Sequence, residues 1–154
     1  MDNKNKLALI FIGIPASGKS TFFKLNYEDK LVHVNLDTLH TRNNERALVE
    51  KCLAEGKSFV VDNTNPTKED RHRYISVAKA AGYRVEGYFF QSILQDCIKR
   101  NNHREGKDRI PDVAIVNISK KLELPDRMEG FDELYFIKIE NGKFCKELWK
   151  EDKT

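Results

Sequence analysis

The chain has 154 residues, of which 40% are hydrophobic and 33% are charged, and its formal net charge is +3. This length and balance predict one globular, soluble domain over residues 1–154, and the net charge is too small to indicate a nucleic-acid partner by itself. No stretch approaches the roughly 20 apolar residues of a membrane span, so we expect no membrane partner.

The three cysteines are Cys52, Cys97 and Cys145, and they are widely separated. An odd number at such spacing does not form a disulfide framework, and none of them stands with a histidine at the spacing of metal ligands. We therefore expect no disulfide partner, no zinc site and a reducing, cytoplasmic environment.

Positive charge is concentrated in residues 67–109, which contain ten Lys or Arg against six Asp or Glu. Such an excess indicates either a solvated helix face or a surface that binds a polyanion. The sequence leaves these two interpretations open.

The first element along the chain is an apolar run at residues 7–12, which predicts a buried strand. The following segment, residues 13–21, matches G-x-x-x-x-G-K-[ST], the phosphate-binding P-loop, between a strand and a helix as required. Its glycines allow a tight turn whose backbone N–H groups converge on nucleotide phosphates. We expect Lys19 to reach the β- and γ-phosphates and the Ser20 hydroxyl to ligate Mg²⁺. The alternative is a glycine-rich turn that binds nothing.

Strands and helices then alternate along the chain. Further strands are expected at residues 31–34, 58–61, 83–90 and 134–139. Helices are expected from Asn43 to Glu55, from an N-cap at Thr67 to Gly82, from a cap at Ser92, and from Pro111 in a first helical turn. The pair Asn141-Gly142 predicts a tight turn, so residues 143–149 are expected to return as a hairpin or edge strand.

Five alternations of strand and helix predict a three-layer α/β domain with a mainly parallel, five-stranded sheet. With the P-loop, this pattern indicates a P-loop NTPase fold of the nucleoside-kinase type. The polar segment 99–109 has no apolar periodicity and lies between two helices, as a helical lid would. In such sheets, ligands bind beyond the carboxyl ends of the strands.

Two aspartates and a basic segment are expected at that edge of the sheet. Asp62 has the position of an acid that helps to hold Mg²⁺ beside a P-loop, or it caps a turn or helix. Asp37 can orient an alcohol and accept its proton, or it is a helix N-cap. Arg100, Arg104 and Arg109 can neutralise charge on a transferred phosphoryl group, or they form a solvated basic turn.

Six short motifs follow one another from Leu7 to Ile139. They are Gly-Ile-Pro-Ala-Ser-Gly-Lys-Ser-Thr (13–21), Val-His-Val-Asn-Leu-Asp-Thr-Leu (32–39), Asp-Asn-Thr-Asn-Pro (62–66), Arg-Asn-Asn-His-Arg (100–104), Ile-Pro (110–111) and Glu-Gly-Phe (129–131). In these motifs and their order, the chain resembles the kinase domain of the polynucleotide kinase family, which phosphorylates 5′-hydroxyl ends of DNA or RNA.

The resemblance implies that ATP and Mg²⁺ are the cofactors and that a 5′-hydroxyl nucleic-acid end is a partner. It implies that Asp37 is the general base, Lys19 a catalytic phosphate ligand and Arg104 the catalytic lid arginine. Ser20 and Asp62 would ligate Mg²⁺. The nucleotide would be bound by Gly13, Pro15, Ala16, Ser17, Gly18, Lys19, Ser20, Thr21, Arg100 and Arg104. The acceptor would be bound by Asp37, Thr38, His40, Asn63 and Asn65.

Two positions depart from the pattern of this family. Leu36 stands where the family often has an arginine, and His40 stands where some members use an arginine to grip the phosphate of the substrate. Both changes remove positive charge from the acceptor side and leave the ATP side untouched. The Asp-x-Asp motif of the phosphatase half that many members carry is absent, so we expect a kinase only.

Three functions therefore remain open. The first is an ATP-dependent 5′-hydroxyl polynucleotide kinase, which steeply salt-dependent binding of oligonucleotides would favour. The second is a P-loop kinase of a small alcohol or metabolite. The third is a non-catalytic nucleotide-binding module, for which a base at Asp37 would have no use.

Overall fold

The computed structural model describes residues 6–151, which form one six-stranded sheet in the order β2-β3-β1-β4-β5-β6. The strands are β1 Leu7–Ile12, β2 Val32–Val34, β3 Phe59–Asp62, β4 Arg84–Phe90, β5 Glu133–Glu140 and β6 Lys143–Leu148. The first five are parallel and β6 is antiparallel to β5. The expected count of five strands is thus corrected to six. The sixth is the hairpin strand that Asn141-Gly142 predicts, and both turn residues have positive φ, as a two-residue hairpin loop requires.

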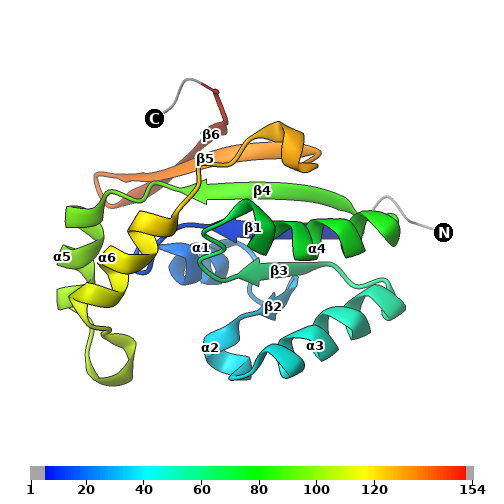
Figure 1. Ribbon diagram of the computed structural model, residues 1–154, viewed down its shortest axis with the longest axis horizontal. Coiled ribbons are helices and arrows are strands. Elements are labelled where there is room, and N and C mark those ends of the chain that lie inside the picture. The colour runs from blue at the N-terminus through cyan, green and yellow to red at the C-terminus, as the bar shows by residue number, and fades with distance from the viewer. Residues whose placement is uncertain (1–5, 152–154) are drawn as a thin grey trace.

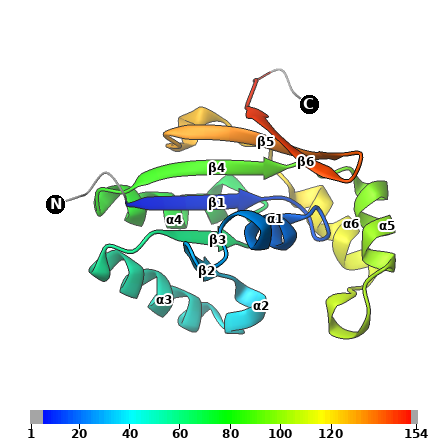
Figure 2. The ribbon, with the colours of Figure 1, turned by 180° about the vertical axis from the view of Figure 1, so that it is seen from behind.

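Helices cover both faces of the sheet and one of its ends. They are α1 Lys19–Asn26, α2 Leu36–Leu39, α3 Arg42–Glu55, α4 Lys68–Ala80, α5 Leu94–Asn102 and α6 Asp112–Lys121, with short 3₁₀ turns at Gly106–Asp108 and Arg127–Glu129. Figure 1 shows α3 and α4 in front of the sheet, and Figure 2 shows α1 on the opposite face. In both views α5 and α6 stand beyond the carboxyl ends of β1 and β4. This is the predicted three-layer fold.

The apolar strand β1 lies at the centre of the core. Its residues from Ala8 to Ile12 are fully buried, because helices cover the sheet on both faces. One apolar cluster fills the space between the sheet and α3 and α4, and a second lies between the sheet and α1. A third joins Ile14 and Ala16 of the P-loop to Cys97 of α5 and Ile115 of α6. The P-loop therefore packs directly against the helices beyond the sheet.

Local capping sets the start of the two long helices. The Thr67 hydroxyl accepts from the Asp70 N–H at 3.1 Å, and the Asp70 carboxylate accepts from the Thr67 N–H, so the predicted cap of α4 is confirmed as a capping box. Helix α3 starts at Arg42, one residue before the predicted Asn43, because the Thr41 side chain provides its cap.

The predicted cap at Ser92 is wrong. Helix α5 follows Ile93 and has no side-chain cap. The Ser92 hydroxyl instead donates to the Phe90 carbonyl at 2.8 Å and accepts from the Ile14 N–H at 3.1 Å. Ser92 therefore ties the P-loop to the end of β4, a long-range role that a local capping rule cannot predict.

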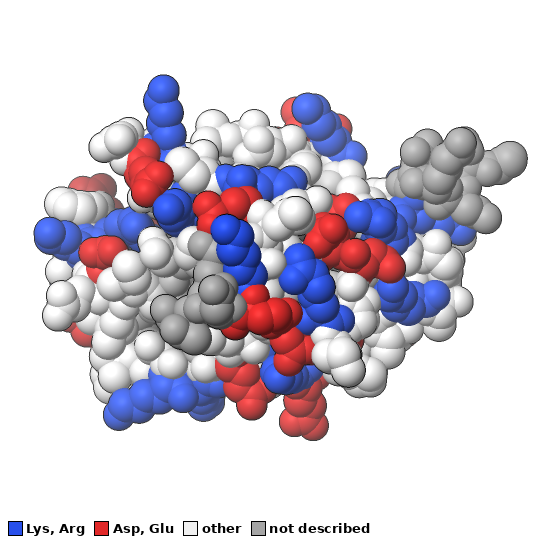
Figure 3. Space-filling model, turned by 90° about the horizontal axis from the view of Figure 1, so that it is seen from above, with Lys and Arg blue, Asp and Glu red and all other residues white. Residues whose placement is uncertain are grey.

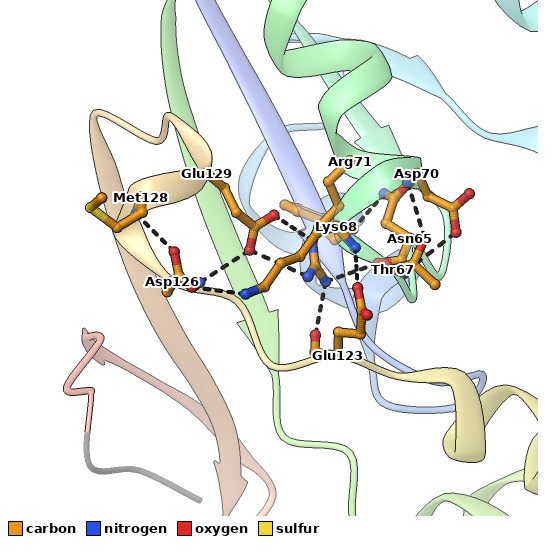
Figure 4. Close-up of polar contacts among 10 residues, drawn as sticks. Asn65, Thr67, Lys68, Asp70, Arg71, Glu123, Asp126, Met128 and Glu129 are labelled. Carbon is orange, nitrogen blue, oxygen red and sulfur yellow. Dashed lines mark hydrogen bonds and ion pairs between the residues drawn. The ribbon is translucent and has the colours of Figure 1, made fainter.

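Arg71 of α4 is completely buried. Its guanidinium donates to both carboxylate oxygens of Glu129, with Nε to Oε1 at 2.9 Å, and to the carbonyl oxygens of Asn65 and Glu123. Figure 4 shows these contacts joining α4 to the segment that leads towards β5. Because a buried charge is costly unless it is fully paired, these four acceptors fix the two elements together.

Glu129→Gln is expected to lower the free energy of unfolding by about 2 kcal/mol, because it leaves the Arg71 guanidinium buried without a counter-charge. Denaturant unfolding measures the loss. Lys79→Met is the matched control, because it removes the exposed Lys79–Asp132 ion pair of 2.6 Å. That change is expected to cost less than about 1 kcal/mol. Equal losses of unfolding free energy in the two variants would contradict a larger contribution of the Arg71–Glu129 pair to stability.

Two further features bear on the environment of the fold. Among residues 6–151 no helix combines the length and the apolar character that crossing a membrane requires. Cys52, Cys97 and Cys145 are free thiols, and burial raises the pKa of Cys52 and of Cys97.

Candidate functional site

The P-loop, residues 13–18, connects β1 to α1 at the carboxyl edge of the sheet. A Cβ on Gly13 would lie 2.7 Å from Ser17 Oγ, and one on Gly18, whose φ is +104°, would lie 2.9 Å from the Phe144 ring of β6. Only glycine fits at either position. The other residues predicted to bind phosphate lie in this loop or in the first turn of α1: Pro15, Ala16, Ser17, Ser20 and Thr21.

Lys19 extends from α1 back into this loop. Its Nζ donates to the carbonyl oxygens of Gly13 at 2.9 Å and Ile14 at 3.0 Å, and the residue is 8% exposed. Burial lowers the pKa of Lys19 to about 8, against the opposing negative charges of Asp62 and Asp37, and the positive charge of Arg104 adds to the lowering. The charges of Asp37, Asp62 and Arg104, all predicted at the site, therefore influence the pKa of the Lys19 ammonium group.

Asp62 ends β3 and is 2% exposed. Its Oδ2 accepts from the Ser20 hydroxyl at 2.9 Å and lies 2.7 Å from His33 Nε2. The His33 ring also stacks on Phe23 of α1, with centroids 3.9 Å apart. His33 lies in the predicted strand at residues 31–34, and the stacking is that of a packed strand residue. The sequence gives no signal for the bond to Asp62, because that contact depends on the pairing of β2 with β3.

Asp37 lies in the first turn of α2 and its side chain is exposed. The N-cap of this helix is Asn35, whose Oδ1 accepts from the Thr38 N–H at 3.2 Å. The alternative interpretation of Asp37 as an N-cap is therefore wrong, and its carboxylate is free of that task. Thr38 and His40 are also exposed, and His40 ends the helix with a positive φ of 73°.

Two asparagines attach α2 to the end of β3. Asn35 Nδ2 donates to the Asp62 carbonyl at 2.6 Å, and Asn63 Oδ1 accepts from the Leu36 N–H at 2.9 Å. Sequence reasoning missed Asn35, although an asparagine two residues before the exposed acid is a local N-cap signal. Asp37 is thereby held beside Asp62.

Asn65 is buried beside β1. The residue is 4% exposed, and its Nδ2 donates to the Phe11 carbonyl at 2.7 Å, which ties the segment after β3 to β1. This bond gives Asn65 a structural role, and its contact with the acceptor stays a prediction. An amide buried against a strand carbonyl belongs to the scaffold of the site.

The three predicted arginines differ in what they contact. Arg100 of α5 donates to the Ala16 carbonyl of the P-loop at 3.0 Å. Arg104 and Arg109 are exposed and donate to the Asp108 carbonyl and to Asn102 Oδ1. The positive charge of Arg104 contributes to the lowered pKa of Lys19.

The basic excess of residues 67–109 divides into two parts. On α4 and β4 each arginine or lysine is paired with a carboxylate: Lys68, Arg71, Arg73, Lys79 and Arg84. From 99 to 109, within the described chain, no Lys or Arg forms an ion pair. Figure 3 shows positive and negative side chains interleaved on the face seen from above. The unpaired positive charge of this stretch therefore lies in residues 99–109, the segment predicted as a lid.

The site suits ATP and Mg²⁺ by the chemistry of its groups. The loop offers the backbone N–H groups and the buried ammonium that phosphates require. The hydroxyl of Ser20 and the carboxylate of Asp62 are adjacent hard oxygen donors, the type that Mg²⁺ prefers. The described residues contain no cluster of three or more His, Cys, Asp or Glu that could hold a metal ion.

Curated proteins similar to this chain include kinases that act on nucleic acids, by their names. A protein of Acanthamoeba polyphaga mimivirus that bears the name bifunctional polynucleotide phosphatase/kinase is 32% identical over 85% of this chain and 33% of its own length. The bifunctional polynucleotide phosphatase/kinase of Schizosaccharomyces pombe is 28% identical over 92% of this chain and 36% of its own. The L-seryl-tRNA(Sec) kinase of Methanococcus maripaludis is 25% identical, over 82% and 56%. This chain thus spans about a third of the first two relatives.

Solved structures share the fold at low identity. A gluconokinase from Sinorhizobium meliloti 1021 superposes with a TM-score of 0.65 at 18% identity, over 86% of this chain and 82% of its own. Chaetomium thermophilum Kti12 in complex with ADP-AlF₃ gives 0.64 at 16%, over 85% and 88%. A family model described as an AAA domain matches residues 9–125, from β1 to the loop after α6. The chain therefore belongs to this AAA domain family and has the fold of a P-loop kinase.

Proposed function

We propose that this chain transfers the γ-phosphate of ATP to the 5′-hydroxyl end of a polynucleotide. The observation that carries the proposal is the exposed carboxylate of Asp37 on α2, a helix that Asn35 ties to Asp62, the partner of Ser20. A phosphate cradle alone would serve any P-loop protein, whereas an exposed carboxylate beside it supports transfer to an alcohol. The names of the two polynucleotide phosphatase/kinases that are similar to this chain support a nucleic-acid acceptor.

The nucleotide side of the proposal uses the P-loop and the lid. Lys19 would exchange the two loop carbonyls that it now binds for oxygens of the β- and γ-phosphates. Ser20 and Asp62 would hold Mg²⁺, which when bound neutralises charge on the phosphates. Arg100 lies on α5 and Arg104 follows its C-terminal end. Their guanidinium groups would stabilise the negative charge that develops on the phosphoryl group during transfer.

The acceptor side of the proposal uses Asp37. The 5′-oxygen of the acceptor attacks the γ-phosphorus, the bond to the leaving oxygen of ADP breaks, and the proton of the hydroxyl passes to the Asp37 carboxylate. The exposed side chains of Thr38 and His40 lie on the same short helix and could bind the acceptor beside it.

A small alcohol is the second candidate acceptor, and Leu36 is the observation that favours it. This residue offers no positive charge next to Asp37, and its backbone N–H is already bound to Asn63. A polynucleotide would then have to be gripped by other residues. The choice between the two acceptors is therefore an experimental one.

The decisive experiment incubates the chain with γ-labelled ATP, Mg²⁺ and a 5′-hydroxyl oligonucleotide. We expect label at the 5′ end, removable by a phosphatase, and none on the same oligonucleotide with a 5′-phosphate. A nucleoside with a free 5′-hydroxyl is the matched small acceptor. Equal transfer to nucleoside and oligonucleotide would favour the small-alcohol function, and release of free phosphate alone would contradict a kinase.

Arg104→Ala is expected to lower the single-turnover transfer rate by about 10²-fold, because one donor to transition-state charge is worth about 3 kcal/mol. Arg109→Ala removes an equally exposed arginine from the same segment and is expected to change the rate by less than about threefold. Comparable effects of the two variants would mean that the segment acts only through its total charge.

A further inference from the structure

Glu45 of α3 is a buried carboxylate outside the phosphate site. The residue is 2% exposed, and both of its oxygens accept hydrogen bonds. Oε1 accepts from the Tyr74 hydroxyl at 2.6 Å and from Arg42 Nη1 at 2.9 Å, and Oε2 accepts from Asn63 Nδ2 at 2.6 Å. Burial raises the pKa of Tyr74 to about 12, so its hydroxyl keeps its proton and donates.

The contact with Glu45 sets the direction of the Asn63 amide. Both oxygens of Glu45 accept hydrogen bonds, and the NH₂ group of Asn63 donates to one of them, so the NH₂ end of the amide faces Glu45. The carbonyl end of the amide then faces the backbone N–H of Leu36 and accepts from it at 2.9 Å. A side chain on α3 thereby decides whether the first N–H of α2 meets an acceptor.

The acceptor on Asn63 holds the N-terminal end of α2. The helix has four residues, and its C-terminal end is held by Leu39, which packs against the main apolar cluster and whose carbonyl accepts from Asn44 Nδ2 at 2.8 Å. Side chains attach its N-terminal end at two points, through Asn63 and through Asn35. Asp37 directly follows Leu36, so a tilt of α2 would move its carboxylate.

We propose that Glu45 is a positioning residue for Asp37, acting through Asn63 and the first N–H of α2. The inference rests on the function proposed above, in which Asp37 receives the proton of the acceptor. It assigns Asn63 to this relay rather than to direct contact with the acceptor. Displacing a reacting group by about 1 Å can cost about 10²-fold in rate, so a relay of this kind has a measurable effect.

The test breaks the relay with one substitution and rebuilds it with a second. Asn63→Asp places a carboxylate against Glu45, where the contact is now 2.6 Å and like charges repel. The single-turnover transfer rate to a 5′-hydroxyl oligonucleotide is expected to fall about 30-fold, with ATP affinity within about twofold of wild type. Adding Glu45→Gln supplies an amide that donates to the new carboxylate, whose other oxygen still accepts from Leu36. The double variant is expected to return to within about fivefold of the wild-type rate.

Tyr74→Phe is the matched control. It removes a 2.6 Å hydrogen bond from the same carboxylate and leaves Asn63 untouched. Its melting temperature is expected to fall, while the rate per folded molecule stays within about twofold of wild type. If Asn63→Asp does not fold, Glu45→Ala removes the same hydrogen bond between Glu45 and Asn63 without adding a charge. The rate is then expected to fall about tenfold at unchanged ATP affinity.

Three results would count against the inference. A double variant that regains its melting temperature but not its rate would overturn it, because Asn63 would then touch the acceptor. An unchanged rate in Asn63→Asp or Glu45→Ala would overturn it too, since the network would be structural only. A wild-type chain that labels no oligonucleotide would instead overturn the proposed function, and the inference with it.

Discussion

Lys19→Ala is expected to lower the rate of phosphoryl transfer by about 10³-fold or more, because it removes the one ammonium group buried inside the P-loop. The change deletes the bonds to the carbonyl oxygens of Gly13 and Ile14. It also removes the cost of burying a cation, a cost that lowers the pKa of Lys19 to about 8. Because this gain opposes the loss of the two bonds, the free energy of unfolding is expected to change little. Single-turnover assays with labelled ATP measure the rate, and thermal melting confirms the fold.

Lys24→Ala provides the matched control. Lys24 lies on the same helix, in its last turn, and is exposed. Its removal changes the net charge by the same amount and is expected to leave the rate within about twofold. A near-normal rate for Lys19→Ala would remove the P-loop from the mechanism, whatever the acceptor.

The parts of the fold that the sequence predicts well are those fixed by neighbours in the chain. The buried run of β1 and the capping box of Thr67 with Asp70 depend only on residues within a few positions of each other. The turn at Asn141-Gly142 is equally local, and the only open question was whether the following strand joins the sheet. It does, antiparallel to β5.

The parts that local patterns predict poorly depend on remote partners. Ser92 has the side chain of a helix cap but bonds to the P-loop, 78 residues earlier in the chain. Arg71 looks like one more charge on a solvated helix, yet it is fully buried and its partner Glu129, whose side chain is 7% exposed, lies 58 residues away. No periodicity within α4 distinguishes this arginine from the exposed Arg73.

The same distinction holds at the candidate site. The P-loop glycines and Lys19 can be located from the sequence because phosphate binding requires these residues at this fixed spacing. Asn63 and Asn65 belong to one short polar motif, and the sequence cannot separate them. The structure does so: Asn63 faces α2, whereas Asn65 is buried against β1. The sequence gives no signal that Glu45 is buried, because an acidic residue on a helix is ordinarily exposed to solvent.

Asp37→Asn is expected to lower the transfer rate by about 10³-fold, within the range measured for loss of a general base. Asparagine keeps the shape and the hydrogen bonds of the side chain but cannot take a proton. Because the N-cap of α2 is Asn35, the substitution removes no cap and the fold is expected to stay intact. Single-turnover phosphorylation of a 5′-hydroxyl oligonucleotide measures the rate, and nucleotide binding is measured on the same protein.

The affinity for ATP separates a base from a structural residue. ATP and acceptor meet the γ-phosphate from opposite sides, so an acceptor-side group acts on the chemical step. The negative charge of Asp37 lies within range of Lys19, and its removal near the phosphates is expected to leave ATP affinity unchanged or slightly higher. Glu50→Gln, an exposed acid on α3, is the control for lost charge and is expected to be silent. A transfer rate unchanged by Asp37→Asn would exclude this carboxylate as the base, and weakened ATP binding would place it on the nucleotide side.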